Sequence, residues 1–293
     1  MTTPGLALAA PATRVPVVTG AGVGAAAGVA LVGVAILAVL FGDQLAPFRA
    51  TELAGSSLEA PSREHLLGTN LLGQDVASQL ILGTRSSLLV ALVAGAGTVL
   101  VGGIVGILAG WFRGWFDATL MRVTDLMLVI PKLPLLLLVG ALAGGSALTL
   151  AFLIALLFWP VAARVLRAQT LSLRGSTHVR AATGFGAGPG HQLRRHIVPA
   201  LALLVVAEFI PAASRAVAML AGLAFLGVGD PTEPSWGGIM RDAVAYRGLF
   251  VTPAWTWWLL PPIVAVVMLV VAITLIGVGA ERRLNPRLGR HRR

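Results

Sequence analysis

Three observations on the sequence predict an all-α fold, a polytopic membrane bundle of six transmembrane helices. Hydrophobic residues make up 57% of the 293 residues and charged residues only 12%, against roughly 25% charged in ordinary soluble domains. Apolar stretches of about 20 residues, enough to cross a bilayer, recur along the chain. The basic residues gather in alternate connections, as the positive-inside rule expects. The chain is therefore predicted to be one membrane domain.

The first predicted span covers residues 22–41. The uncharged run from Val15 to Gly42 is longer than the roughly 7–15 apolar residues of a signal peptide, so the helix is predicted to be retained. Residues 1–21 are then a cytoplasmic tail, and residues 42–85 an external loop.

The second predicted span covers residues 87–111. Within it Gly102, Gly106 and Gly110 repeat at every fourth position and so share one helix face. Small residues at this spacing let two helices approach closely, and we favour packing inside the chain over a dimer contact.

The third and fourth spans share the uncharged stretch Leu133–Ala163. Its 31 residues are too long for one span and too short for two, at about 1.5 Å per residue. A third span that begins near Met121 leaves room for two helices with a turn at residues 143–146. Residues 201–223 and 257–279 complete the six.

Charge asymmetry supports this count. With both termini on one side, that side holds 15 of the 22 basic residues and the other side only five. Residues 86–280 then form a five-helix core and residues 281–293 a basic cytoplasmic tail. Several predicted helices carry prolines that interrupt them: Pro131, Pro134, Pro160, Pro211, Pro261 and Pro262.

Composition also excludes several kinds of site. The absence of cysteine excludes disulfides and thiolate metal sites. The histidines do not cluster as metal ligands do, so no metal site is predicted. The net charge of +10 is attributed to topology rather than to nucleic-acid binding. The "WTWW" run at residues 255–258 is predicted to lie in an interfacial aromatic belt.

Three motifs occur along the chain: residues 65–88, "HLLGTNLLGQDVASQLILGTRSSL", residues 120–137, "LMRVTDLMLVIPKLPLLL", and residues 223–240, "LAFLGVGDPTEPSWGGIM". In this order they resemble three motifs of one family, the C-type permease subunits of dipeptide and oligopeptide ABC importers. The first is similar to that family's segment of roughly the form HPLGTDxxGRDVxSRLxYGARxSL. The resemblance extends from about residue 63 to the C-terminus.

The resemblance implies a type I ABC importer permease fold in a bacterial inner membrane. It further implies a second, B-type permease, one or two ABC ATPase subunits and an external substrate-binding protein as partners. The chain has no phosphate-binding GxxxxGK[ST] motif, so ATP and Mg are expected on the partner ATPase subunits and no cofactor on this chain. The chain itself is expected not to be an enzyme.

The resemblance also assigns a role to the basic segment 178–200. In the family a cytoplasmic EAAxxxG loop forms a short coupling helix that docks on the ATPase. Ala181, Ala182, Gly186 and Pro199 match that pattern, whereas Arg180 replaces the family's glutamate. The substitution leaves a docking helix possible but not the glutamate's ion pair.

Two further groups of residues are candidates for function. Glu208 and Arg215 lie within the fifth predicted span, and charges inside a membrane normally face protein or water. They are translocation-pathway candidates, with structural pairing to a neighbouring helix as the alternative. In the loops that carry the family motifs, Asp75, Arg85 and Trp236 are candidates for docking the binding protein.

Two other functions remain open at this point. A secondary carrier would use Glu208 to carry a proton and Arg215 to modulate the pKa of Glu208. A passive membrane scaffold would need neither residue. Within the leading interpretation, di- or oligopeptides are the expected substrates. Haem, glutathione and nickel chelates are the alternatives.

Overall fold

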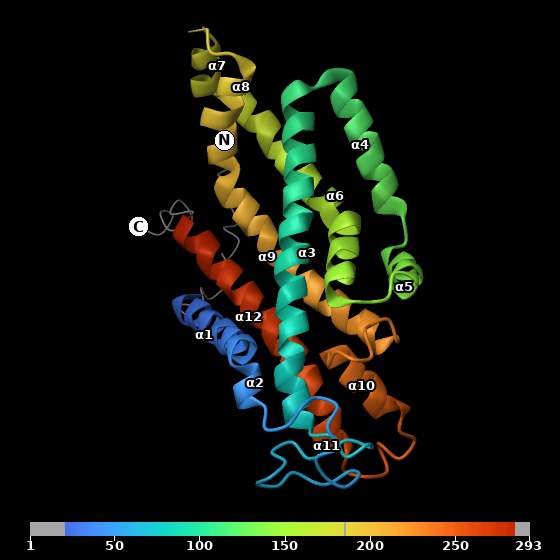
Figure 1. Cartoon of the computed structure of the whole chain (residues 1–293). Helices are drawn as coiled ribbons and strands as arrows, with labels where there is room; N and C mark the ends of the chain where they lie inside the picture. Colours follow the sequence, from blue (N-terminus) through green and yellow to red (C-terminus); the bar gives the residue numbers. More distant parts are fainter. Residues whose placement is uncertain (1–20, 185, 285–293) are drawn as a thin grey trace, which may run out of the picture.

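The protein is a bundle of long helices with shorter helices and loops at both ends (Figure 1). The computed structural model describes residues 21–184 and 186–284, so most of both predicted tails lies outside it. Within the described residues the only β-type contact is an isolated bridge between Thr69 and Asp75. The all-α prediction is confirmed.

The six predicted spans correspond in order to six helical units. The long helices are α1 (Ala21–Leu40), α3 (Val76–Phe112), α4 (Gly114–Val129), α5 (Lys132–Leu142), α6 (Ala147–Arg174), α9 (Val198–Phe225) and α12 (Leu260–Leu284). The short ones are α2 (Gly42–Leu45), α7 (Thr177–Gly184), α8 (Pro189–Gln192), the π-helical turn η1 (Leu193–Ile197), α10 (Trp236–Ala245) and α11 (Trp255–Trp258).

The third predicted span is not one straight helix. Helices α4 and α5 meet at an angle of 83° across the break at Ile130 and Pro131. Four helices of the described residues are long and apolar enough to cross a membrane, five if the bent pair is one span. The predicted count of six therefore requires the shorter apolar helix α1 as well.

Helix α3 begins at Val76, ten residues before the predicted boundary of the core at residue 86. Its 37 residues are about 55 Å long at 1.5 Å per residue, well beyond the roughly 30 Å of a bilayer's hydrocarbon core. Gln79, Thr84 and Arg85 interrupt its first turns. A search for uninterrupted apolar stretches therefore finds the helix only after Arg85.

The glycine stripe of α3 packs against α6, as predicted. A Cβ on Gly102 would lie 2.6 Å from the carbonyl oxygen of Trp159, and one on Gly110 would lie 2.8 Å from the Cβ of Thr170. A Cβ on Gly106 would collide with the backbone of Ala163. Only glycine permits this approach of the two helices.

Helix α1 lies at the side of the bundle, next to α12 (Figure 1). A Cβ on Gly28 of α1 would lie 2.7 Å from the carbonyl oxygen of Ala272 of α12. The backbones of the two helices therefore approach closely, which fixes the position of the first span.

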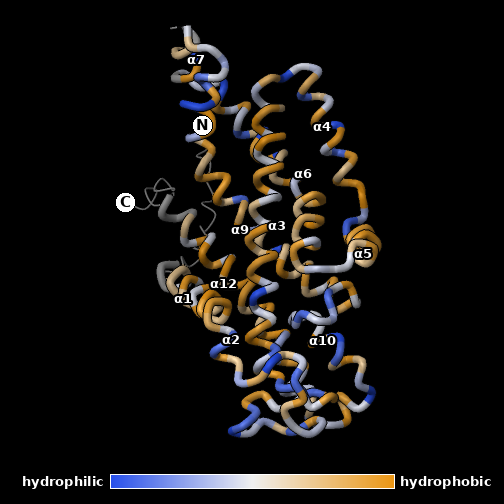
Figure 2. The backbone as a smooth tube through the Cα atoms, viewed as in Figure 1, coloured by the Kyte–Doolittle hydropathy of each residue, from blue (hydrophilic) through white to orange (hydrophobic). Residues whose placement is uncertain are grey.

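Polar residues gather at the two ends of the bundle, with mostly hydrophobic helices between them (Figure 2). We call the end formed by residues 46–75 and 226–259 the loop end. We call the opposite end, with α7, α8 and the corner between α3 and α4, the α7 end. The predicted coupling segment and the loops predicted to dock the binding protein thus lie at opposite ends of the bundle.

Candidate functional site

The predicted coupling segment folds as a short helix that projects at the α7 end (Figure 1). Arg180, Ala181 and Ala182 lie in α7, and Arg180 and Ala181 are exposed. Gly186 follows with a φ of +83°, a left-handed conformation that favours glycine. The backbone N–H of Ala187 then donates to the carbonyl oxygen of Ala182, at 3.0 Å. The segment is a closed helix and turn rather than an extended loop.

One apolar residue anchors α7 to the bundle. Val179 is 1% exposed and packs in a cluster with Trp111, Leu166, Ile197 and Leu201. These residues come from the ends of α3, α6, η1 and α9. Val179 thus joins α7 to a cluster that includes residues of three long helices.

Arg174 closes the same corner. Its guanidinium donates to the carbonyl oxygen of Trp111 at 2.5 Å and lies 5.4 Å from the centre of that indole ring. Hydrogen bonding and a cation–π contact thus tie the end of α6 to the end of α3. The turn that leads from α6 into α7 therefore starts at a residue held in place by these two contacts.

The return into the bundle is a continuous helical run. Pro189 is the first residue of α8 rather than a break in the chain, as expected for proline at a helix start. The π-helical turn η1 then leads into α9, and Pro199 follows within its first turn. Arg194 and Arg195 are exposed on this run, so the α7 end presents a basic surface.

At the loop end, Asp75 is buried and not available for docking, which corrects the prediction from sequence. Its carboxylate accepts a hydrogen bond from the backbone N–H of Ser78 at 2.7 Å and lies 3.0 Å from Nδ1 of His65. The side chain is 1% exposed. Asp75 is the N-cap of α3 and fixes the preceding loop to it.

Trp236 is likewise buried, so it too is a structural residue rather than a docking residue. Its indole Nε1 donates to the carbonyl oxygen of Leu80 at 2.9 Å, and the residue is 5% exposed. In the "WTWW" run, Trp257 and Trp258 lie in the core instead of an interfacial belt, whereas Trp255 is 41% exposed and the prediction stays open for it. Of the three docking candidates, only Arg85 is exposed.

The loop between α9 and α10 also carries charge. Asp230 accepts hydrogen bonds from the hydroxyl and the backbone N–H of Thr232, and these lower the pKa of its carboxyl below the ordinary value of 3.8. The carboxylate is therefore ionised at neutral pH, at the end that carries the family motifs.

Glu208 and Arg215 both lie in α9 but are not paired with each other. Arg215 is exposed and donates from Nε to the carbonyl oxygen of Pro211 at 3.0 Å, while Glu208 is half-buried. None of the ion pairs among the described residues joins these two side chains. Because a charge in lipid is costly, the α9 face with Arg215 requires water or another subunit beside it.

Two ion pairs between α4 and α6 were missed by the sequence reasoning. Arg167 makes a bidentate contact with Asp117, with both nitrogen–oxygen distances at 2.6 Å, and Arg164 contacts Asp125 at 2.6 Å. The partners of each pair are at least 39 residues apart in sequence. Asp125 lies four residues after the predicted start of the third span near Met121, whereas Asp117 precedes that span and both arginines follow the fourth. Charges of opposite sign on the same side of these two neighbouring spans were the available signal.

Metal binding finds no support in the geometry. Within residues 21–184 and 186–284, no group of three or more histidine or acidic side chains is placed to hold a metal ion. His191 and His196 stack edge to face with their ring centres 6.1 Å apart.

Comparison with known proteins agrees with this arrangement. The model of the family described as "Binding-protein-dependent transport system inner membrane component" matches residues 102–290, well over half of the chain. The chain belongs to this family. Family members are permease subunits of ABC importers and not enzymes, so membership decides against a secondary carrier or a passive scaffold.

Individual relatives of this permease match over a similar range. It is 33% identical to the oligopeptide transport system permease protein OppC of Mycobacterium tuberculosis, over 78% of both chains. It is 31% identical to the glutathione transport system permease protein GsiD of Pectobacterium atrosepticum, over 78% of this chain and 75% of that one. It is 37% identical, with the same coverage, to a protein of Brucella suis provisionally named a peptide permease.

Proposed function

We propose that this permease forms half of the membrane pathway of an ATP-driven importer for di- or oligopeptides. A second, B-type permease completes the pathway, one or two ABC ATPase subunits carry ATP and Mg, and an external binding protein delivers the peptide. The relatives named for peptides, for oligopeptides and for glutathione, itself a tripeptide, support the substrate class.

The observation that carries the mechanism is the placement of α7. This helix projects at the end opposite the family's loop motifs, and Val179 anchors it among the ends of α3, α6 and α9. ATP-driven closure of the ATPase subunits would push α7, and the anchor would pass that motion to the three helices. Arg180, Ala181, Ala182 and Gly186 shape the contact surface, and Pro199 lies in the first turn of α9, one of the helices that move.

The basic character of the α7 end indicates the kind of partner. Arg180, Arg194 and Arg195 are exposed there, so the ATPase groove that receives α7 is expected to carry acidic residues. Arg180 in place of the family's glutamate inverts the charge, and the partner's surface is expected to be inverted to match.

Substitution of Ala182 tests the proposal in the assembled transporter. Ala182→Pro removes a helix hydrogen bond and costs about 3 kcal/mol within a helix, so peptide uptake and the ATPase activity stimulated by the loaded binding protein should both be lost. Ala182→Ser keeps the helix and should retain both. Normal uptake by Ala182→Pro, at normal expression, would disprove the coupling role.

A further inference from the structure

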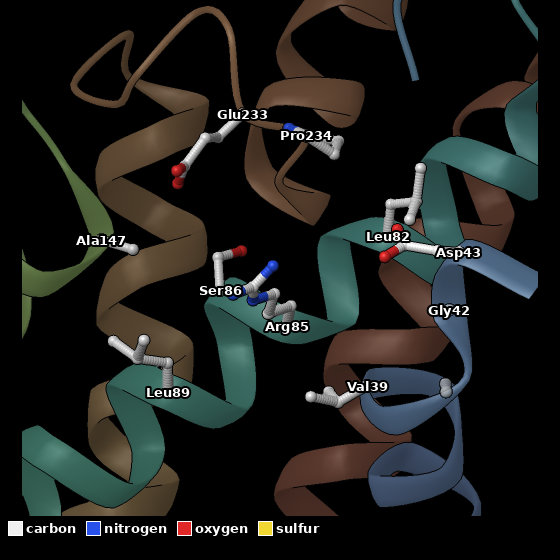
Figure 3. A pocket seen from close by; sticks show the side chains of 11 residues that line it. Val39, Gly42, Asp43, Leu82, Arg85, Ser86, Leu89, Ala147, Glu233 and Pro234 are labelled. Atoms are coloured by element: carbon white, nitrogen blue, oxygen red, sulfur yellow. The ribbon is translucent and has the colours of Figure 1, made fainter. Parts of the chain in front are cut away.

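A mixed-charge recess at the loop end is not used by the mechanism above (Figure 3). It has a volume of about 320 Å³, near the lower end of the range of roughly 300–1,000 Å³ for small-molecule sites. Asp43 of α2, Arg85 of α3 and Glu233 of the loop before α10 enter it from three separate elements. Val39, Leu82 and other apolar side chains form the rest of the wall.

The three charged side chains have no partners within the part of the chain that the structure describes. None of the ion pairs or side-chain hydrogen bonds between described residues includes the carboxylate of Asp43 or Glu233 or the guanidinium of Arg85. All three side chains are exposed, so water solvates their charges when the recess is empty. A ligand with complementary charges would replace that water with direct ion pairs.

The signs of the charges select among occupants. An inorganic dianion would meet Arg85 but would be repelled by two carboxylates on either side. A cation would be repelled by Arg85. A zwitterion satisfies both, since its carboxylate pairs with the guanidinium and its ammonium group with Asp43 or Glu233. The apolar wall between them suits an uncharged side chain.

We propose that this recess binds the free termini of a short peptide, with Arg85 on the carboxylate and Glu233 and Asp43 on the ammonium group. This inference rests on the proposed peptide transport and adds to it a first binding site on the permease itself. The site lies at the end where the binding protein is proposed to dock, so it would hold the peptide as that protein releases it.

The recess also borders a narrower cavity that leads toward α9. This second cavity, of about 20 Å³, shares Ser86, Ala147 and Glu233 with the recess and is also lined by Leu220 and Ala224. Leu220 and Ala224 belong to the same helix as Arg215, the pathway candidate. A peptide in the recess is thus next to the helix along which it would travel.

Titration of the assembled transporter in nanodiscs, without its binding protein, tests the inference. The probes are trialanine, its C-terminal amide and its N-acetyl derivative. Wild type should bind trialanine about tenfold more tightly than either capped form, since each cap removes one charged hydrogen bond. Arg85→Gln should lose this preference over the amide, and Glu233→Gln the preference over the acetylated form. Arg85→Lys should retain part of it.

Arg63→Gln is the matched control, because it removes the same charge from the loop end outside the recess. It should bind all three probes as wild type does. Equal binding of the three probes by wild type, or no binding, would overturn the inference. So would an Arg85→Gln effect confined to association with the binding protein, which would make the recess a protein-docking surface.

The same preparation separates this inference from the proposed function. ATP-driven peptide uptake with the binding protein present, combined with no discrimination between free and capped trialanine, would refute the recess and leave the proposed function intact. Absence of ATP-driven peptide uptake would refute the proposed function itself.

Discussion

The three candidate docking residues differ in burial. Buried candidates stabilise the fold, whereas an exposed candidate is accessible to a partner. Asp75 and Trp236 carry the family motifs but are buried, while Arg85 on the same helix as the Asp75 cap is exposed. The sequence places Asp75 and Arg85 in one family motif and Trp236 in another, and it offers no sign of this division. Burial of Asp75 depends on His65, ten residues earlier in a loop whose path no local pattern predicts.

Asp75→Ala is expected to lower stability rather than affect docking. The substitution removes the N-cap of α3 and leaves the His65 ring without its partner in a buried site, at a cost of about 1–3 kcal/mol. A lower unfolding temperature of the purified permease in detergent would confirm this. Arg85→Gln, which breaks no hydrogen bond within the described residues, should melt as wild type does; equal melting of Asp75→Ala would contradict the structural role.

At the scale of helices, a periodic pattern predicts a contact well when both partners lie in regular structure. The glycine stripe of α3 was predicted to pack within the chain, and it does pack on α6. For the bend between α4 and α5, Pro131 predicts that the helix is interrupted but does not predict the angle. The angle of 83° depends on how α5 packs against α6 and the loop end.

Two substitutions in α3 should change stability in opposite directions. Gly106→Ala places a methyl group against the backbone of Ala163 and should destabilise by about 1–3 kcal/mol through overpacking. Gly103→Ala meets only Leu166 Cδ1 at an ordinary 3.6 Å and should stabilise by about 0.5–1 kcal/mol through helix propensity. Thermal unfolding of both variants decides this, and a shift of the same sign in both would count against the packing.

The two ion pairs between α4 and α6 should differ in strength. Asp117 and Arg167 are 14% and 32% exposed and make a bidentate contact, so Asp117→Asn should cost about 1–3 kcal/mol. Asp125 and Arg164 are both 54% exposed, and Asp125→Asn should cost about 0–1 kcal/mol. The charge swap Asp117→Arg with Arg167→Asp should recover part of the loss; a double-mutant cycle that shows no coupling would refute the pairing.

For the whole molecule, charge predicts the orientation in the membrane, and this prediction is testable because the chain has no cysteine. By the positive-inside rule, the basic α7 end is expected in the cytoplasm and the loop end outside. Ser57→Cys, at the exposed loop end, should react in intact cells with a thiol reagent that does not cross membranes. Ala181→Cys in α7 should react only after the cells are opened. The reverse pattern would remove α7 from the ATPase side and with it the coupling proposal.

The uncovered faces of the single chain predict where the proposed second permease and the pathway lie. Helix α12 exposes an uncharged stripe that includes Val264, Val267 and Val271, which suits lipid. Helix α9 instead exposes Arg215 and Ala218 within a span that also carries Glu208. A charge in that position is stable only beside water or protein, so the α9 face should border the pathway between the two permeases.

Single cysteines on the two faces distinguish these environments. Ala218→Cys in the assembled transporter should react with a small hydrophilic thiol reagent, and the reaction should slow when ATP and the loaded binding protein change the state of the pathway. Val267→Cys should be inert in every state, because such reagents do not partition into lipid. If position 267 reacts and position 218 does not, the pathway runs along α12, and Arg215 must be neutralised by a contact with the second permease rather than by water.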